Sequence, residues 1–174
     1  MDPIMPLGDD MTVRLAEPAD APAVASVHVL SWQATYRGQI PDDVLDNLEV
    51  ERSQAMWERA IPRGEVWVAL AGDEVVGFAC TGPSREVEGI FQLYAIYFLP
   101  SAWGSGLAAP LAQAALGDAP DTIVWVLEDN GRARRFYERL GFVVDGTTRD
   151  ETFGSTVVKE IRYRRQGVKP PHTA

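Results

Sequence analysis

The chain has 174 residues, 46% of them hydrophobic, and a formal net charge of −9 at pH 7. This length suffices for one domain whose core needs no metal or disulfide, and the single cysteine, Cys80, excludes a disulfide framework. The acidic balance argues against a nucleic-acid partner, which requires a basic surface, and two histidines, His28 and His172, make a metal site unexpected. Without a signal-like N-terminus or an apolar run of about 18 residues, we expect a cytoplasmic protein with no membrane partner.

Hydrophobic periodicity and turn residues predict the elements in chain order. We expect a flexible leader at 1–10, a single domain at 11–165 and a flexible tail at 166–174. Apolar residues at helical spacing predict helices at about 21–36, 50–61, 106–117 and 131–140. Apolar, β-rich runs predict strands at about 12–16, 66–70, 75–81, 93–99, 122–127, 142–144 and 156–163. This order predicts an α/β fold with a mixed central sheet and helices on both faces. Strands 93–99 and 122–127 should be parallel neighbours, with a ligand at their carboxyl ends.

The segment 93–117 has the order strand, glycine turn, helix. Strand 93–99 is apolar on both faces, so we expect both to be buried. Gly104 and Gly106 precede the helical pattern, and the free N–H groups of a helix start favour a phosphate. Residues 104–109 also fit GxGxxA, a dinucleotide-binding pattern. Because Pro100–Trp103 separates the strand from the first glycine and few strand–helix repeats follow, a nicotinamide or flavin cofactor is the weaker interpretation.

A second motif follows the next predicted strand. Residues 130–142 are NGRARRFYERLGF and residues 100–111 are PSAWGSGLAAPL. Together they resemble the GNAT superfamily of N-acetyltransferases, in which a Q/R-x-x-G-x-G/A turn binds the pyrophosphate of acetyl-CoA. In that family N-x-x-A-x-x-F-Y-x-x-x-G-F forms the next strand–helix unit. The likeness extends over about 12–164, although Trp103 stands where the family more often has Gln or Arg.

The resemblance implies acetyl-CoA as co-substrate and a set of cofactor-binding residues. Backbone N–H groups of one turn would bind the pyrophosphate: Gly104, Ser105, Gly106, Leu107, Ala108 and Ala109. The backbone of Ile96, Tyr97 and Phe98 would pair with the pantetheine arm as an added strand would. Asn130 would bind the pantetheine or order the strand end, and Ala133 and Phe136 would line the channel.

The resemblance also places Tyr137 near the thioester sulfur. A phenol with a pKa of about 10 can protonate a leaving thiolate with a pKa of about 8.5, so Tyr137 is the candidate general acid. The alternative is a helix-face residue packed under Phe142. Many family members carry a carboxylate base on the strand before the turn, but Ile90 and Gln92 occupy those positions. Glu88, of the same strand parity, is the candidate base; the alternatives are a solvated loop glutamate, a water chain or a backbone carbonyl.

The acceptor side contains Trp32 and Tyr36, which share a helix face at i,i+4. They are either an aromatic pair in the core or a wall of the acceptor pocket. The implied function is direct attack on acetyl-CoA, in a ternary complex, by an amine of a small molecule or peptide. The alternative is an acyl-CoA-binding regulatory module with lost or weak catalysis, because positions 90 and 92 lack a carboxylate. The acceptor and the use of other acyl-CoAs stay open, and so does a homodimer through the last strands.

Overall fold

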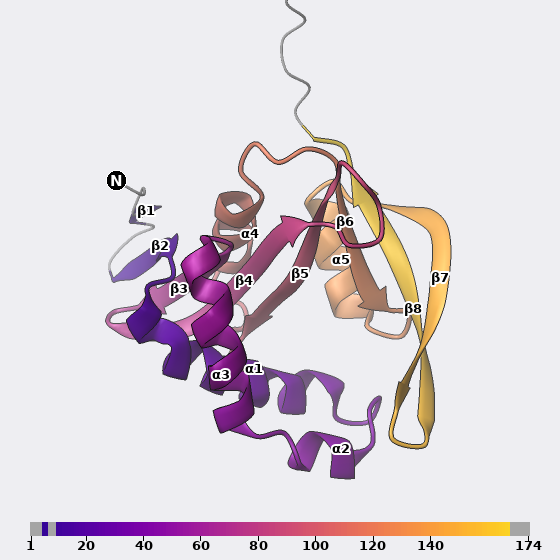
Figure 1. The fold of residues 1–174 in the computed structure, drawn as a ribbon, viewed down its shortest axis with the longest axis horizontal. Helices are drawn as coiled ribbons and strands as arrows, with labels where there is room; N and C mark the ends of the chain where they lie inside the picture. The colour runs from indigo at the N-terminus through magenta and orange to yellow at the C-terminus, as the bar shows by residue number, and fades with distance from the viewer. Residues whose placement is uncertain (1–4, 7–9, 168–174) are drawn as a thin grey trace, which may run out of the picture.

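The structure, a computed structural model, describes residues 5–6 and 10–167. Within these residues one mixed sheet has the strand order β1-β2-β3-β4-β5-β6-β8-β7. Figure 1 shows α1 and α3 on one face of this sheet and α4 and α5 on the other, which confirms the predicted α/β class. The strands are β1 Met5–Pro6, β2 Met11–Leu15, β3 Val66–Ala71, β4 Glu74–Pro83, β5 Phe91–Phe98, β6 Thr122–Leu127, β7 Val143–Phe153 and β8 Thr156–Arg165. The helices are α1 Ala21–Tyr36, α2 Asp42–Asp46, α3 Val50–Ala60, α4 Ala108–Leu116 and α5 Gly131–Arg139, with single 3-10 turns at Pro18–Asp20, Ile61–Arg63 and Pro100–Ala102.

The strands β5 and β6 are parallel neighbours, as predicted, but they pair over two residues only. Phe91 lies opposite Thr122 and Gln92 opposite Ile123; after that the strands separate. A bulge in the pairing of β4 with β5 adds Tyr94 as an extra residue, since Thr81 pairs with Leu93 and Cys80 with Ala95. Bulges bend a strand and increase its twist. The β6-facing edge of β5 therefore has no strand partner among the described residues beyond Gln92.

This separation makes one sequence prediction wrong. We expected strand 93–99 to be buried on both faces, yet Tyr94 is 39% exposed and residues 95–99 are only partly buried. The strand is apolar on both sides because each side packs on the core of one face, Ile96 and Phe98 on one and Ala95 and Tyr97 on the other. The same four residues also line the opening between β5 and β6.

Each face of the sheet has its own hydrophobic core. Under α4 and α5 the core contains Leu107, Leu111, Phe142 and Tyr163, all nearly inaccessible to solvent. Under α1 and α3 a second core contains Val24, Trp57, Phe78 and their neighbours. The two cores fix the helices on opposite faces and leave the separated strand ends between them.

Other departures from the sequence predictions lie mainly at the C-terminal hairpin and the termini. The strand expected at 142–144 extends to Phe153. The sequence did not predict this length because the residues of the strand are largely polar and partly exposed, and they lack an apolar alternation. The short helix α2 was not predicted. Of the expected leader, Met5–Pro6 pair with β2, and 1–4 and 7–9 lie outside the described residues. Of the expected tail, Gly167 donates its N–H to Asp121, and 168–174 lie outside the described residues.

A half-buried histidine connects α1 to α3. The Nδ1 atom of His28 lies 2.8 Å from Ser53 Oγ and 3.4 Å from Trp57 Nε1. Because the indole N–H can only donate, Nδ1 is an acceptor and the ring is neutral. Burial lowers the pKa of His28 to about 4.

We expect this histidine to make the protein less stable in mild acid. The unfolded chain gains a proton near pH 6.5, whereas the folded chain gains it only near pH 4. The free energy of unfolding should therefore fall by up to about 3 kcal/mol as pH decreases through that window. Urea unfolding at a series of pH values measures this slope. The H28Q variant should be less stable at neutral pH but show a flatter slope; an unchanged slope would contradict the assignment.

Candidate active site

A cavity of about 870 Å³ occupies the opening between β5 and β6. Its walls come from the end of α1, from β5 and β6, from the starts of α4 and α5, and from the β7–β8 hairpin. It therefore reaches both faces of the sheet, with α4 and α5 at one end and α1 at the other. Most of the residues selected from the sequence line this cavity: Trp32, Tyr36, Ile96, Tyr97, Phe98, Gly104, Gly106, Ala108, Ala109, Asn130, Ala133, Phe136 and Tyr137.

The glycine turn forms one end of the cavity. Gly104 and Gly106 have φ angles of +78° and +85°, a region that glycine alone adopts without strain. A Cβ on either residue would meet nothing within 4 Å, so the backbone conformation, not space, requires glycine here. Neither N–H group is bonded to another described residue, and the first turn of α4 adds further free N–H groups. Pro110, the third residue of α4, is tolerated because its N–H would have had no partner within the helix.

Two residues of the predicted phosphate turn have other roles. Ser105 donates its N–H to Ala102 O at 3.2 Å, and its Oγ accepts from Leu107 N at 3.4 Å. The Leu107 side chain is 1% exposed and belongs to the core under α4. Neither residue lines the cavity, so both stabilise the turn from inside.

Trp103, at the position where the resemblance leads us to expect Gln or Arg, braces the same turn. Its Nε1–H donates to Phe98 O at 3.1 Å, so this carbonyl of β5 already has a partner. The Arg132 guanidinium lies over the Trp103 ring, 4.2 Å from its centroid. Both side chains line the cavity, and the stacked arginine places a positive charge at its glycine-turn end.

Asn130 fixes the start of α5 at the end of β6. Its Oδ1 accepts from Ala133 N at 3.2 Å, a helix N-cap that satisfies one free donor. Of the two roles left open for Asn130, ordering the strand end is the one for which the structure shows a contact. Ala133 and Phe136, one and two turns further, line the cavity wall.

Tyr137 packs against Phe142 and also lines the cavity. Its ring packs against Phe142, with centroids 5.8 Å apart, and the residue is 8% exposed. It also lines the cavity, and its hydroxyl is not hydrogen-bonded to any other described residue. Burial raises the pKa of this phenol, with a smaller contribution from Tyr36. The hydroxyl therefore stays protonated near neutral pH and is free to donate to a bound molecule.

Aromatic side chains form the opposite end of the cavity. The Tyr36 and Tyr97 hydroxyls are 2.8 Å apart and hydrogen-bonded, and the Trp32 ring lies 5.0 Å from Tyr36. Phe153, at the tip of the β7–β8 hairpin, lies 6.1 Å from Trp32. Burial raises the pKa of both Tyr36 and Tyr97. Trp32 and Tyr36 are therefore a cavity wall as well as a packed pair.

The structure does not bring Glu88 to the cavity. It is exposed in the turn before β5, which begins only at Phe91, so the expected strand parity with Gln92 is wrong. Gln92 does line the cavity, but an amide cannot act as a base. Cys80 also has no part in the site: burial raises the pKa of its thiol to about 11, as suits an inert packed side chain.

The cavity residues that were not singled out from the sequence include Trp125, Arg149, Phe153 and Glu160. Trp125 is the only large polar-tipped side chain in an otherwise aliphatic strand, which is the one signal that could have singled it out. The other three come from the hairpin of β7 and β8, whose position over the aromatic end depends on pairing between β6 and β8.

Comparison with known proteins identifies the family. Residues 20–142 match the family model described as "Acetyltransferase (GNAT) family". The Mycobacterium tuberculosis protein named "Probable N-acetyltransferase Rv2775" is 30% identical over 172 residues, covering 93% of this chain and 97% of that one. YuaI of Bacillus subtilis, an N-acetyltransferase by name, is 38% identical over 130 residues, which are 69% of this chain and 73% of YuaI. The PaiA N-acetyltransferase of Thermoplasma acidophilum, solved with coenzyme A, has the same fold, with a TM-score of 0.72, 17% identity and coverage of 90% and 98%.

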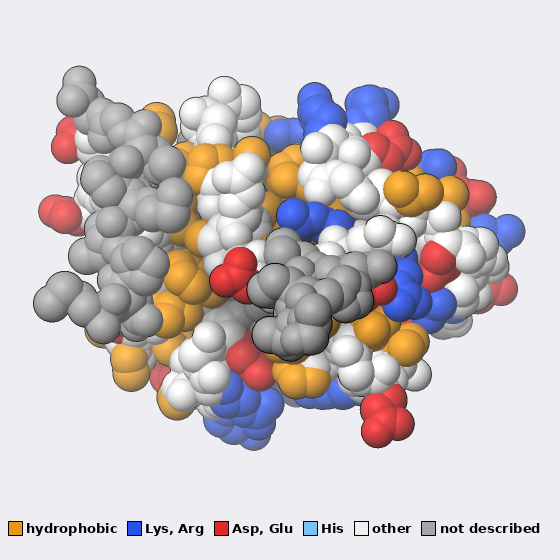
Figure 2. All heavy atoms as spheres, turned by 90° about the horizontal axis from the view of Figure 1, so that it is seen from above, with side chains coloured by type: hydrophobic (Ala, Val, Ile, Leu, Met, Phe, Trp, Pro, Cys, Tyr) orange, Lys and Arg blue, Asp and Glu red, His pale blue; other side chains and the backbone are white. Residues whose placement is uncertain are grey.

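The chain belongs to the GNAT family of acetyltransferases. It is an N-acetyltransferase with acetyl-CoA as co-substrate, as the two sequence motifs imply. None of the helices within residues 10–167 is both long and apolar enough to cross a bilayer. On the face drawn in Figure 2, arginine and lysine side chains lie in small groups among acidic and hydrophobic ones, not as one basic surface.

Proposed function

We propose that the protein transfers an acetyl group directly from acetyl-CoA to an amine of a small molecule or peptide, with both substrates bound at once. The observation that carries this proposal is the single cavity that joins the glycine turn to the aromatic end through Tyr137. A shared cavity lets the two substrates approach from opposite faces of the sheet, so no covalent acyl-enzyme is needed. Holding both in one site supplies much of the rate enhancement through orientation.

The cofactor end has the groups that acetyl-CoA requires. The N–H groups of Gly104, Gly106 and the first turn of α4 suit the pyrophosphate, and Arg132 adds a positive charge beside them. The unpaired edge of β5 at Ile96 and Tyr97 suits the amide groups of the pantetheine arm, which would extend the sheet. Ser105, Leu107 and the carbonyl of Phe98 are bonded or packed elsewhere and serve the shape of the turn.

Tyr137 supplies the proton that the reaction needs at the sulfur. As the amine attacks the thioester carbonyl carbon, the C–N bond forms, the C–S bond breaks and the thiolate leaves. Tyr137, protonated and without a competing hydrogen bond, donates its proton to that sulfur. Backbone N–H groups on the open edge of β5 stabilise the negative charge that develops on the carbonyl oxygen.

Two measurements test this function. Acetyl-CoA should bind in calorimetry and raise the melting temperature, and a panel of primary amines should release free thiol in its presence. Release of thiol only with an amine, and formation of the acetylated amine by mass spectrometry, would exclude a regulatory module that merely binds acyl-CoA. Failure to bind acetyl-CoA, or thiol release with no acetylated product, would contradict the proposal.

A further inference from the structure

One carboxylate faces the cavity. Among the described residues that line it, Glu160 of β8 is the only aspartate or glutamate, and the lining contains no histidine, lysine or cysteine. Its side chain is 15% exposed. It lies at the aromatic end, close enough to Tyr36 for its charge to raise the pKa of that phenol, after the larger effect of burial. Glu160 is thus the one described side chain placed to receive a proton or an ammonium group there.

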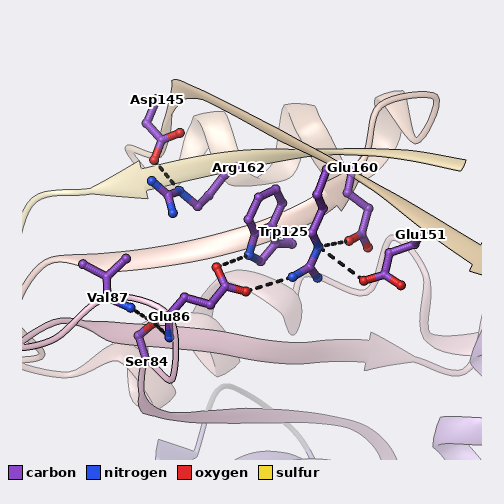
Figure 3. Close-up of polar contacts among 9 residues, drawn as sticks. Ser84, Glu86, Val87, Trp125, Asp145, Glu151, Glu160 and Arg162 are labelled. Carbon is purple, nitrogen blue, oxygen red and sulfur yellow. Dashed lines mark hydrogen bonds and ion pairs between the residues drawn. The ribbon is translucent and has the colours of Figure 1, made fainter.

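Glu160 is held by an arginine that is itself fixed on several sides. Arg149 Nε lies 2.6 Å from Glu160 Oε2, and Arg149 Nη1 lies 2.8 Å from Glu86 Oε1. The guanidinium also stacks on Trp125, 4.1 Å from the ring centroid, while Trp125 Nε1 donates to Glu86 Oε2 at 3.1 Å. Figure 3 shows the side chains of Glu86, Trp125 and Glu160 pointing toward one another, with dashed lines for these contacts. Since β6, β7, β8 and the loop before β5 all contribute, the arginine cannot swing away without breaking several contacts.

The loop that carries Glu86 is ordered at its own start. Ser84 Oγ accepts hydrogen bonds from Glu86 N and Val87 N, both at 3.1 Å (Figure 3). This turn aims the Glu86 carboxylate at Arg149 and Trp125. The loop before β5, Trp125 and Arg149 therefore act together to hold one carboxylate of β8 in place.

The charges around Arg149 do not balance. Three carboxylates lie within 4 Å of its guanidinium, because Glu151 is 3.5 Å from Nε in addition to Glu86 and Glu160. Arg162, which also lies over the Trp125 ring, is paired with Asp145 at 2.6 Å. Glu160 Oε1 accepts no hydrogen bond from any described residue. A surplus of negative charge beside aromatic ring faces is an environment that attracts an organic cation.

We propose that Glu160 binds the ammonium group of the acceptor and accepts its proton as the new C–N bond forms. This inference rests on the proposed function and deepens it. The acceptor class is a primary amine on an apolar stem: the stem lies against Trp32, Phe153 and the ring of Trp125, and the nitrogen faces Glu160. The ammonium first loses one proton to solvent, which gives the neutral amine. As the C–N bond forms, the attacking nitrogen loses a second proton to Glu160. Tyr137 gives one proton to the departing thiolate. Arg149 is a positioning residue.

The test uses phenethylamine as the probe and phenylalanine as its matched analogue, which adds a carboxylate to the same amine. The E160Q variant keeps the shape of the side chain and an oxygen for Arg149. We expect its kcat/KM for phenethylamine to fall about 100-fold, with the acidic limb of the pH–rate profile flattened and acetyl-CoA affinity unchanged. The matched control is D150N, which removes an exposed carboxylate of the same hairpin that does not line the cavity; its kinetics and pH profile should match the parent protein.

Binding of the amine is measured separately from turnover. Phenethylamine should bind the parent protein saturated with coenzyme A and bind E160Q at least 10-fold more weakly, and phenylalanine should bind the parent more weakly than phenethylamine. Equal binding and equal kinetics in E160Q, a preference for phenylalanine, or no binding of phenethylamine to the parent would each overturn the inference. Acetyl-CoA binding with amine-dependent thiol release would leave the proposed function standing in all three cases, whereas loss of acetyl-CoA binding by the parent would remove that function itself.

Discussion

Replacement of Tyr137 by phenylalanine should lower kcat by about 10²–10⁴-fold while the affinity for acetyl-CoA stays within about twofold. The range is that of a positioned general acid, and the ring that packs on Phe142 is retained. The hydroxyl has no hydrogen bond to another described residue, so its removal leaves no orphaned partner. Stability should therefore change little or rise slightly. Steady-state kinetics, calorimetry with acetyl-CoA and thermal unfolding measure the three quantities.

Tyr163 provides the matched control for the same chemical change. It is fully buried on the same face of the sheet, 6.5 Å from Tyr137 between ring centroids, but it does not line the cavity. Its hydroxyl donates to Glu138 Oε1 at 2.9 Å and accepts from Arg134 Nε at 3.1 Å. Tyr163→Phe should cost about 1–3 kcal/mol of stability and leave kcat near the parent value. If the two variants lost turnover alike, or if Tyr137→Phe retained it, Tyr137 would not be the acid.

The geometry of the glycine-turn end of the cavity could be predicted from the sequence because it is local. The strand, glycine turn and helix of 93–117 are consecutive in the chain, and so are β6, Asn130 and α5. Residue types and short spacings are enough to predict the positive φ angles at Gly104 and Gly106 and the helix cap at Asn130. Such features depend on a few neighbouring residues, so a pattern of a dozen positions specifies them.

The aromatic end, the proposed acceptor site, could not be predicted in the same way because it is assembled from distant segments. Glu160 enters the cavity only because β8 pairs with β6 and β7 pairs with β8, which brings residues 149–160 over the end of α1. Most residues of β7 are polar, and they alternate between exposed and partly buried positions. The hydrophobicity pattern of the sequence therefore indicates neither the length of this strand nor the side that faces the cavity. The same limit explains why the sequence favoured Glu88 as the base. That prediction assumed that Glu88 and Gln92 lie on one side of the same strand, but β5 begins three residues after Glu88, at Phe91.

The two ends also differ in what a substitution can reveal. Side chains dominate the acceptor end, so single replacements there report on one contact each. The proposed pyrophosphate site consists of backbone groups, and only a change in backbone conformation can test it. Gly106 is the position where such a change has the largest expected effect, since its φ of +85° is closed to β-branched residues without strain.

Gly106→Val should weaken acetyl-CoA binding by about 10²–10³-fold. Valine moves the turn away from positive φ, and each charge-assisted hydrogen bond lost to a phosphate is worth about 1.5–3 kcal/mol. The strain itself costs about 1–2 kcal/mol, so the melting temperature should also fall by a few degrees. Calorimetric titration with acetyl-CoA gives the affinity, and thermal unfolding without ligand gives the stability.

Gly64→Val separates the two effects. Gly64 has a φ of +75°, a Cβ there would also meet nothing within 4 Å, and the residue lies at the end of the 3-10 turn Ile61–Arg63, outside the cavity. The same strain should therefore lower the melting temperature to a similar extent and leave acetyl-CoA affinity unchanged. Equal losses of affinity in both variants would mean that binding follows overall stability. A loss confined to Gly106→Val would mean that the N–H groups of this turn hold the phosphates, since no side chain is removed by the change.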